Sequence, residues 1–199
     1  MLRCGAGENW DDVVAYAVNH GYYGMENLSL IPGEVGASAV QNIGAYGAEA
    51  KDIIYAVEAV EIATGEKVVI PAEECHYAYR QSRFKNEWKG LFVITAVTYA
   101  LSKTFIPKLD YGGLKGQFKN PDKVTAADVR NAVINIREAK LPDWHVEGNG
   151  GSFFMNPVVS KEKLEELLGK YPDMPHYDTK IPAGWMIEQC GWKGKTLGN

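Results

Sequence analysis

Strand-like and helix-like patterns occupy different parts of the sequence, and this separation constrains the fold more than any other feature. Two apolar runs within residues 54–70 flank the turn-forming residues 64–66, which predicts a hairpin. Residues 91–101 are mostly apolar and rich in β-formers, which predicts a buried strand. Helical periodicity dominates after the polar segment 119–123. The sequence therefore predicts an α+β fold with a boundary close to that segment.

Capping residues and apolar spacing predict where the helices begin. Asn9 or Asp11 can cap the first helix, and Thr125 and Asp128 have capping-box spacing, with Asp in place of the usual Glu or Gln. Apolar residues at helical spacing follow each of these starts. The predicted helices cover residues 11–20, a segment from 125, a segment from 160 and residues 185–190.

Composition excludes several classes of protein. The chain has 199 residues, of which 46% are hydrophobic and 23% charged, so a folded globular protein is expected and disorder is not. No apolar run approaches the ~18 residues that span a bilayer. The formal net charge is −4 and the basic residues are scattered, which argues against nucleic-acid or anionic-membrane partners.

The three cysteines predict neither disulfides nor a metal site. Cys4, Cys75 and Cys190 are odd in number, far apart and without metal-ligand spacing. The adjacent pair Cys75 and His76 has no second pair to complete a zinc site. The first residues contain no long apolar stretch, so no secretory signal is expected. These features predict a reducing, cytoplasmic compartment.

The glycine-rich segment 31–47 is the strongest local signal for a site. Backbone without Cβ atoms can approach a ligand closely and offer N–H groups to phosphate. The segment lacks the Lys-Ser/Thr of a P-loop and is not a dinucleotide G-x-G-x-x-G. Tight turns in a small-residue loop and a cofactor cradle both remain open from the residues alone.

Two further residues carry possible chemistry. Arg80 lies among the aromatics of residues 77–85 and can recognise a carboxylate through two parallel hydrogen bonds, although an Arg packed on Tyr at the surface fits the same pattern. Ser152 lies in the glycine-rich turn 148–157, where a serine is usually a turn or capping residue. A serine hydrolase has little support, because G-x-S-x-G is absent.

The order of these segments resembles the UDP-N-acetylenolpyruvoylglucosamine reductase family, flavoenzymes of bacterial peptidoglycan precursor synthesis. The resemblance runs from residue 5 to the last residue, and residues 109–114 resemble the substrate-covering tyrosine loop of the type I branch. The motifs are Gly5-Ala-Gly-Glu-Asn-Trp10, Glu26-Asn-Leu-Ser-Leu-Ile-Pro-Gly33, Gln41-Asn-Ile-Gly-Ala-Tyr-Gly47, Tyr79-Arg-Gln-Ser82, Lys140-Leu-Pro142 and Gly151-Ser-Phe-Phe-Met-Asn-Pro157.

The resemblance implies a fold and a cofactor site. Residues 1–123 would form part of a FAD-binding domain of the PCMH/VAO type, and residues 124–199 part of a smaller α/β domain that binds the UDP-sugar substrate. The FAD would lie along the glycine-rich segment. The residues nearest to it would be Gly33, Ser38, Val40, Ile43, Gly44 and Tyr46.

The resemblance also implies the reaction, in which NADPH reduces FAD and the flavin then reduces an enolpyruvyl ether. Arg80 would bind and polarise the enolpyruvyl carboxylate, and Ser152 would donate the proton, so both should converge on one cleft. Tyr111, Lys140 and Asn156 would hold the UDP-sugar. No metal is implied, and the oligomeric state stays open.

Several departures from the family pattern shape a second interpretation. Ala39 stands where many relatives have Pro. Neither the N-terminal lobe with its glycine-rich turn nor the C-terminal segment that supplies a reactive Glu has a match. We therefore expect an incomplete copy that binds FAD poorly on its own. The alternative is a non-catalytic remnant that binds flavin or a nucleotide sugar.

Overall fold

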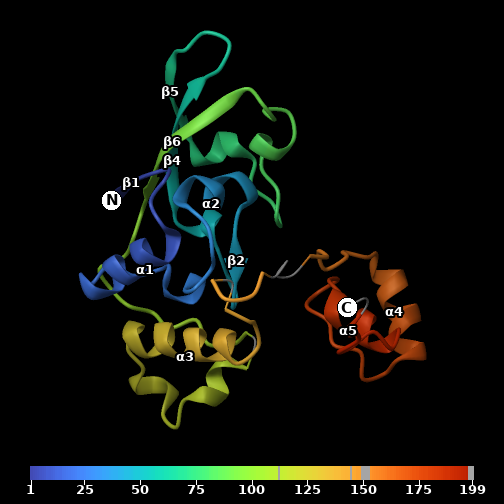
Figure 1. Cartoon of the computed structure of the whole chain (residues 1–199). Helices are drawn as coiled ribbons and strands as arrows, with labels where there is room; N and C mark the ends of the chain where they lie inside the picture. Colours follow the sequence, from blue (N-terminus) through green and yellow to red (C-terminus); the bar gives the residue numbers. More distant parts are fainter. Residues whose placement is uncertain (112, 144, 149–152, 197–199) are drawn as a thin grey trace. The chain divides into compact units, whose positions relative to one another are not determined.

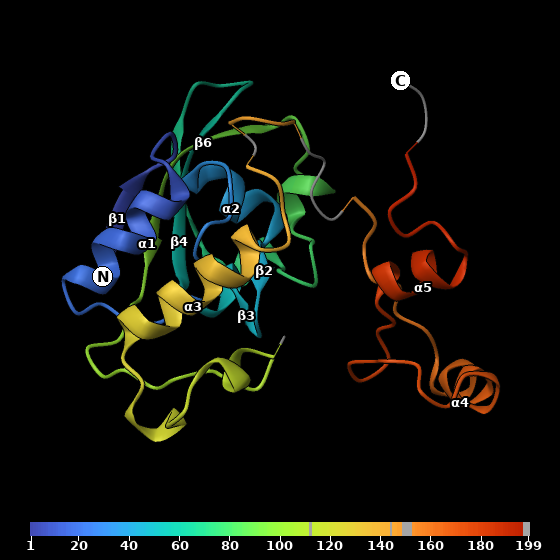
Figure 2. The same ribbon diagram turned by 60° about the horizontal axis from the view of Figure 1, so that its bottom comes forward.

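The computed structural model describes residues 1–111, 113–143, 145–148 and 153–196, and it divides the chain into two compact units. The first unit covers residues 1–147 and the second covers residues 148–199. Helices and antiparallel strands are both present, as Figures 1 and 2 show, which confirms the predicted α+β class. The predicted boundary at 123/124 separates a FAD-binding domain from a substrate-binding domain. The compact units are defined differently, by contacts within the chain, so this boundary stays a prediction.

A four-stranded antiparallel sheet forms the frame of the first unit (Figure 1). Its order is β1-β6-β4-β5, and the buried Val57 of β4 lies opposite Val97 of β6 and Ile70 of β5. The hairpin between β4 and β5 confirms the predicted turn, where Gly65 takes a φ of +74°. The strands are β1 (Leu2–Gly5), β4 (Ile54–Glu61), β5 (Lys67–Pro71) and β6 (Phe92–Tyr99).

Helices α1 and α3 of the first unit begin where the sequence places good caps, whereas α2 begins without a side-chain cap. Asn9 accepts hydrogen bonds from the N–H groups of Asp11 and Asp12, and Thr125 and Asp128 form the predicted capping box. The helices are α1 (Trp10–Asn19), α2 (Val35–Gln41) and α3 (Ala126–Glu138). The short 3₁₀ segments are Glu26–Leu28, Ala50–Asp52, Ala72–Cys75, Arg83–Lys85, Leu114–Gln117 and Pro121–Lys123.

The main core of this unit lies between the sheet and helices α1 and α2. Trp10 and Tyr99 are fully buried and pack edge to face, with ring centroids 5.8 Å apart. The indole N–H of Trp10 donates to the carbonyl of Leu28 at 2.8 Å, so the buried polar group is satisfied. A second, smaller cluster under α3 contains Leu114 and Val129. Helix α3 thus packs within the first unit.

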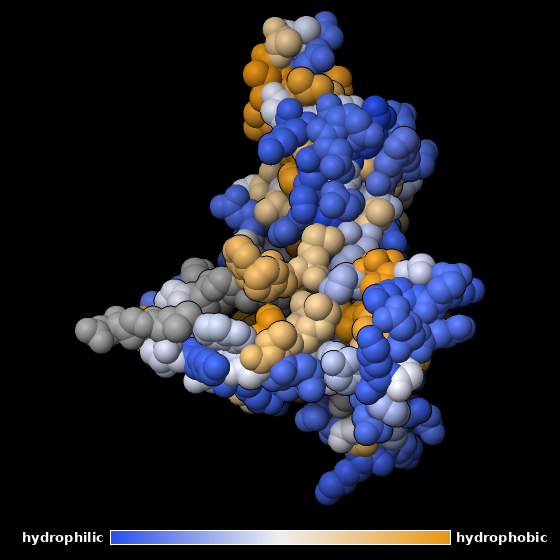
Figure 3. Space-filling model, turned by 90° about the vertical axis from the view of Figure 1, so that its right-hand side faces the viewer, coloured by the Kyte–Doolittle hydropathy of each residue, from blue (hydrophilic) through white to orange (hydrophobic). Residues whose placement is uncertain are grey.

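Two segments of the first unit differ from the prediction. Strand β6 is less buried than expected, because Val93 and Thr95 are exposed on its outer face. Ile62 and Val69 of the β4–β5 hairpin are exposed, and the space-filling view shows apolar surface near its top, just below the extreme tip (Figure 3). The glycine-rich segment contains α2 and β2 (Gly44–Ala45), and β2 pairs with β3 (Ala48–Glu49) just beyond the segment, so it is more than a run of turns.

The second unit is small and has two helices in its described part. These are α4 (Lys161–Lys170), capped by Ser160, and α5 (Ala183–Gln189), and both confirm predicted helices. Its few buried apolar side chains include Met174 and Ile181. In the described residues of the whole chain, no helix has the length and apolar character needed to cross a membrane.

Candidate functional site

The glycine-rich segment is held in conformations that most residues avoid. Helix α2 ends at Asn42, which takes a left-handed conformation with φ +47°. The β2–β3 turn places Tyr46 and Gly47 at φ +45° and +79°, and Arg80 beside the ribbon has φ +56°. Non-glycine residues in this region are strained, and such strain clusters at functional sites. The observed backbone therefore marks this segment as a candidate site.

Arg80 is anchored directly on the glycine-rich segment. Its guanidinium donates from Nη1 to the carbonyl of Asn42 at 3.3 Å and from Nη2 to the carbonyl of Gly44. It also lies 5.6 Å from the ring centroid of Tyr79. In the described part of the chain Arg80 makes no ion pair. The half-buried cation is thus fixed by neutral groups and keeps its charge for a ligand.

Gly44 is required for this arrangement because a side chain there would clash. A Cβ at position 44 would lie 2.9 Å from both Nη1 of Arg80 and the carbonyl oxygen of Ala48. Real Cβ atoms essentially never approach other atoms so closely. The predicted flavin residue Gly44 and the predicted catalytic residue Arg80 are therefore neighbours, although 36 positions separate them.

Asn42 fixes the two arms of this site to each other. Its buried side chain donates to the carbonyl of Ala78 at 2.8 Å and accepts from the N–H of Lys51 at 2.8 Å. Ser82 adds a second link through its hydroxyl, which donates to the carbonyl of Val40. Sequence reasoning did not single out Asn42 or Ser82. Their places beside Gly44 and Arg80 in two motifs were the available signals.

Two of the residues predicted to line the flavin have buried side chains. The hydroxyl of Ser38 donates to the carbonyl of Val35 at 2.6 Å and shares a 2.9 Å hydrogen bond with the hydroxyl of Tyr99. Burial raises the pKa of Tyr99, so this pair stays uncharged at neutral pH. Ile43 is also buried. The backbone N–H groups and carbonyls of Ser38 and Ile43 are also hydrogen-bonded within the chain, so in this conformation both residues stabilise the local fold.

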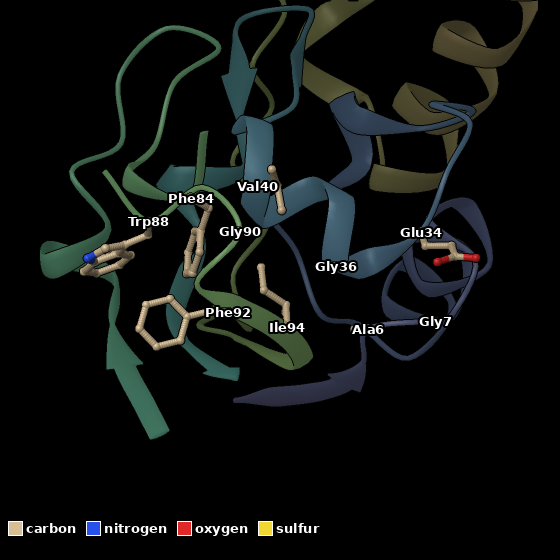
Figure 4. A pocket seen from close by; sticks show the side chains of 10 residues that line it. All are labelled: Ala6, Gly7, Glu34, Gly36, Val40, Phe84, Trp88, Gly90, Phe92 and Ile94. Carbon is tan, nitrogen blue, oxygen red and sulfur yellow. The ribbon is translucent and has the colours of Figure 1, made fainter. Parts of the chain in front are cut away.

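A pocket of about 340 Å³ lies beside α2 and is lined by Val40, another predicted flavin residue. Figure 4 shows three aromatic rings gathered on one side, while small residues and the charged side chain of Glu34 lie on the other. The ring centroids of Trp88 and Phe92 lie 5.5 Å apart, and the guanidinium carbon of Arg83 lies 4.0 Å from the ring centroid of Trp88. The full lining is Ala6, Gly7, Glu34, Gly36, Val40, Phe84, Trp88, Gly90, Phe92 and Ile94.

The other predicted residues of the first unit are dispersed around the segment. Gly33 is exposed in the loop before α2, and Tyr46 is half-buried with its carbonyl bound by Asn27 at 2.8 Å. Burial raises the pKa of the Tyr46 hydroxyl, against the opposing charge of Arg137. Tyr111 lies beside Gly47, where an added Cβ would meet it at 3.3 Å. Lys140 is exposed just beyond α3.

In the second unit, Asn156 has a local structural contact. Its Oδ1 accepts from the N–H of Ala183 at 2.9 Å, at the first residue of α5. The Nδ2 group of this amide can donate two further hydrogen bonds. Ser152 lies outside the described residues, so its convergence with Arg80 stays a prediction. The described residues hold no group of three or more His, Cys, Asp or Glu side chains suited to a metal ion.

Comparison with known families identifies domains at both ends of the chain. Residues 1–70 match the model of the FAD binding domain. Residues 140–199 match the model described as UDP-N-acetylenolpyruvoylglucosamine reductase, C-terminal domain. The first match includes the glycine-rich segment, and the second includes Lys140, Ser152 and Asn156.

Curated relatives match over the whole chain. UDP-N-acetylenolpyruvoylglucosamine reductase of Bacteroides fragilis (strain YCH46) is 55% identical over 100% of this chain and 61% of its own length. The corresponding reductases of Porphyromonas gingivalis and Neisseria gonorrhoeae are 50% and 49% identical, each over 100% of this chain and 60% of its own length. The chain thus spans about three fifths of these relatives.

A solved structure shares the fold. The crystal structure of UDP-N-acetylenolpyruvylglucosamine reductase from Thermus caldophilus aligns with a TM-score of 0.62 over 99% of this chain and 56% of its own, at 21% identity. Fold and domain matches together define a chain built on a FAD-binding domain. More particularly, the whole length of the chain matches UDP-N-acetylenolpyruvoylglucosamine reductases, as the motifs indicated.

Proposed function

We propose that this chain carries part of a FAD-dependent, NADPH-driven reductase that converts UDP-N-acetylglucosamine enolpyruvate to UDP-N-acetylmuramate. One observation carries the proposal. Arg80 is anchored on the carbonyls of Asn42 and Gly44, inside the region that matches the FAD-binding domain. This anchoring would bring a carboxylate-binding cation next to the flavin surface. The reaction belongs to peptidoglycan precursor synthesis, and a cytoplasmic location fits its nucleotide substrates.

The residues of the first unit are compatible with a bound FAD. The backbone at Gly33 is exposed, and no atom of the described residues beyond its chain neighbours lies within 4 Å of where its Cβ would be, so a planar ring or a pyrophosphate can approach it closely. The pocket beside Val40 adds an apolar, aromatic wall of the kind that cofactor sites use. When bound, FAD would supply hydride transfer between NADPH and the enolpyruvyl group.

Arg80 would stabilise charge on the substrate. Reduction of the enolpyruvyl group places negative charge next to its carboxylate, and a fixed guanidinium binds that charge more strongly in the transition state than in the ground state. Because Arg80 is already oriented by two carbonyls, little reorganisation is needed when the charge develops. Ser152 would then deliver the proton to the neighbouring carbon.

Tyr111, Lys140 and Asn156 would hold the UDP-sugar, as the family motifs imply. Lys140 offers an exposed ammonium for the diphosphate, and Tyr111 lies beside the glycine-rich segment at Gly47. Asn156 would donate through its Nδ2 group while its oxygen holds α5. These assignments follow the family motifs, with Tyr111 and Lys140 in the first unit and Asn156 in the second.

The alternative function is a non-catalytic module that binds flavin or a nucleotide sugar. Its support is that the matched relatives are longer, since the chain spans 61% of the Bacteroides fragilis reductase. Titration of the purified chain with FAD, followed by an NADPH-oxidation assay, separates the two. A saturable change in the flavin spectrum and oxidation that depends on the UDP-sugar support the reductase. Saturable flavin binding without substrate-dependent oxidation supports the alternative, and an unchanged flavin spectrum argues against both flavin functions.

A further inference from the structure

Leu30, in the loop before α2, has both its backbone N–H and its backbone carbonyl bound by charged side chains. It takes a left-handed conformation with φ +55°, which is unfavourable for a branched apolar residue. Its N–H donates to Oδ1 of Asp11 at 2.5 Å, and its carbonyl accepts from Nε of Arg137 at 3.1 Å. Two charged side chains from different helices thus bind one strained residue.

These two hydrogen bonds to Leu30 belong to one polar network between α1 and α3. Asp11 also accepts two parallel hydrogen bonds from Arg130, at 2.7 and 2.8 Å. The side chains of this pair are largely buried, with exposed fractions of 23% for Asp11 and 16% for Arg130. Arg130 and Arg137 are seven residues apart on α3, about two helical turns, and therefore lie on one face.

The neighbouring backbone is held by α1 and the chain before it. Trp10 binds the carbonyl of Leu28 through its indole and the carbonyl of Gly33 through its backbone N–H, at 2.8 and 3.0 Å. Gly36 donates to the carbonyl of Ala6 at 2.8 Å. Arg137 therefore adds a contact from α3 to a loop otherwise fixed from the α1 side.

We propose that Asp11 and Arg137 are positioning residues that hold Leu30 in its left-handed conformation and so set the backbone entering the glycine-rich segment. Loss of either hydrogen bond would let Leu30 relax toward negative φ, which would move the path into α2. We call the two hydrogen bonds from Asp11 and Arg137 to the Leu30 backbone the clamp, and its existence rests on these hydrogen bonds alone. An effect of the clamp on FAD binding rests on the proposed function.

Hydrogen exchange measured residue by residue on the purified chain tests the clamp. Arg137→Met should speed exchange of the amides in residues 30–36 by about tenfold while strands β4 and β6 stay unchanged, since only local opening is made easier. Arg137→Lys, which keeps the charge, should show a smaller effect. Arg3→Met is the matched control, because Arg3 forms a bidentate pair with Glu58 on the sheet.

The same substitution made in a Leu30→Gly variant shows whether Arg137 positions the backbone of Leu30 or only packs against the loop. Leu30→Gly removes the steric penalty of positive φ, so adding Arg137→Met to it should change exchange in residues 30–36 far less than in the unmodified chain. An equal effect of Arg137→Met in both backgrounds, or an effect spread evenly over the first unit, would overturn the proposal. No change in exchange would overturn it as well.

A flavin titration of the same variants keeps this inference distinct from the proposed function. If the unmodified chain binds FAD, Arg137→Met should weaken binding by about tenfold, and Asp11→Asn should weaken it more than Asp12→Asn. If the unmodified chain does not bind FAD, the proposed function fails while the exchange data still decide the clamp. Normal FAD affinity in a variant with a loosened loop would refute the link between the clamp and flavin binding.

Discussion

At the scale of single residues, backbone carbonyls orient the side chain of the candidate site residue Arg80. Arg80 is oriented by the carbonyls of Asn42 and Gly44, and these carbonyls point at it because the chain turns through left-handed residues. The sequence motifs indicated Arg80 and Gly44 as site residues, but they could not show that these two residues are in contact. They also could not show that Ser38 turns its hydroxyl toward Tyr99, because hydrogen-bond partners far apart in sequence leave no local pattern.

Gly44→Ala should destabilise the first unit and displace Arg80. The added Cβ would lie 2.9 Å from the Ala48 carbonyl oxygen, which belongs to the paired strand and cannot move freely. We expect a loss of about 1–3 kcal/mol in the free energy of unfolding. Chemical denaturation measures it, with Gly116→Ala as the control, since no atom lies within 4 Å of a Cβ there. Equal stability of the two variants would contradict the packing described for Gly44.

Asn156 should separate into two roles when its two amide atoms are replaced in turn. Asn156→Asp keeps the oxygen that accepts from Ala183, so exchange at the start of α5 should stay slow. Asn156→Ala removes that acceptor and should destabilise α5 by about 0.5–2 kcal/mol. Both variants should weaken binding of the UDP-sugar, because both lose the Nδ2 donor. Tight substrate binding by Asn156→Asp would rule out the proposed role of that donor.

At the scale of elements, local signals predicted helices well where caps and periodicity coincide. Thr125 and Asp128 form a capping box that can be recognised without tertiary information. Helix α2 was not predicted, because its seven residues are short and rich in small side chains, and its packing against β6 is a long-range effect. Likewise the burial of β6 could not be read from its apolar character, since Val93 lies on the exposed face.

The pairing of α1 with α3 should make stability depend on acid pH through Asp11. Burial raises the pKa of Asp11, but hydrogen bonds from Arg130 and Leu30 and the nearby arginine charges outweigh it and hold the pKa below the ordinary 3.8. A carboxylate with a lowered pKa stabilises the folded chain above its ordinary pKa, and this contribution is lost as pH falls through the folded value. The contribution is therefore complete at neutral pH.

Asp11→Asn should cost about 1–3 kcal/mol of unfolding free energy at pH 7, because hydrogen bonds to a charged group are lost. The difference from the unmodified chain should shrink as the pH drops below about 4. Thermal or chemical unfolding from pH 7 to pH 2.5 measures this. Asp12→Asn changes the same charge one residue away and should have little effect. A difference for Asp11→Asn that stays constant with pH would show that the ionised carboxylate does not matter.

At the scale of the whole molecule, about two fifths of the length of the Bacteroides fragilis reductase has no counterpart in this chain, which spans 61% of that relative. If those parts contribute to the flavin site, FAD should bind this chain more weakly than it binds that relative. Each charge-assisted hydrogen bond lost is worth about 1.5–3 kcal/mol, and about 1.4 kcal/mol is a tenfold change in affinity. Parallel titrations of both proteins measure the difference, and equal affinities would refute the prediction.

The proposed function, in which the residues of this chain carry out the reductase chemistry, is tested most directly by a chimera. The chain would replace the matching segment of the 55% identical Bacteroides fragilis reductase, and NADPH oxidation would be followed with and without UDP-N-acetylglucosamine enolpyruvate. We predict oxidation that depends on this substrate, at a rate within about tenfold of the unmodified relative, and a loss of about 10²–10³-fold on Arg80→Met. A folded, flavin-loaded chimera whose NADPH oxidation does not depend on the substrate would contradict the claim.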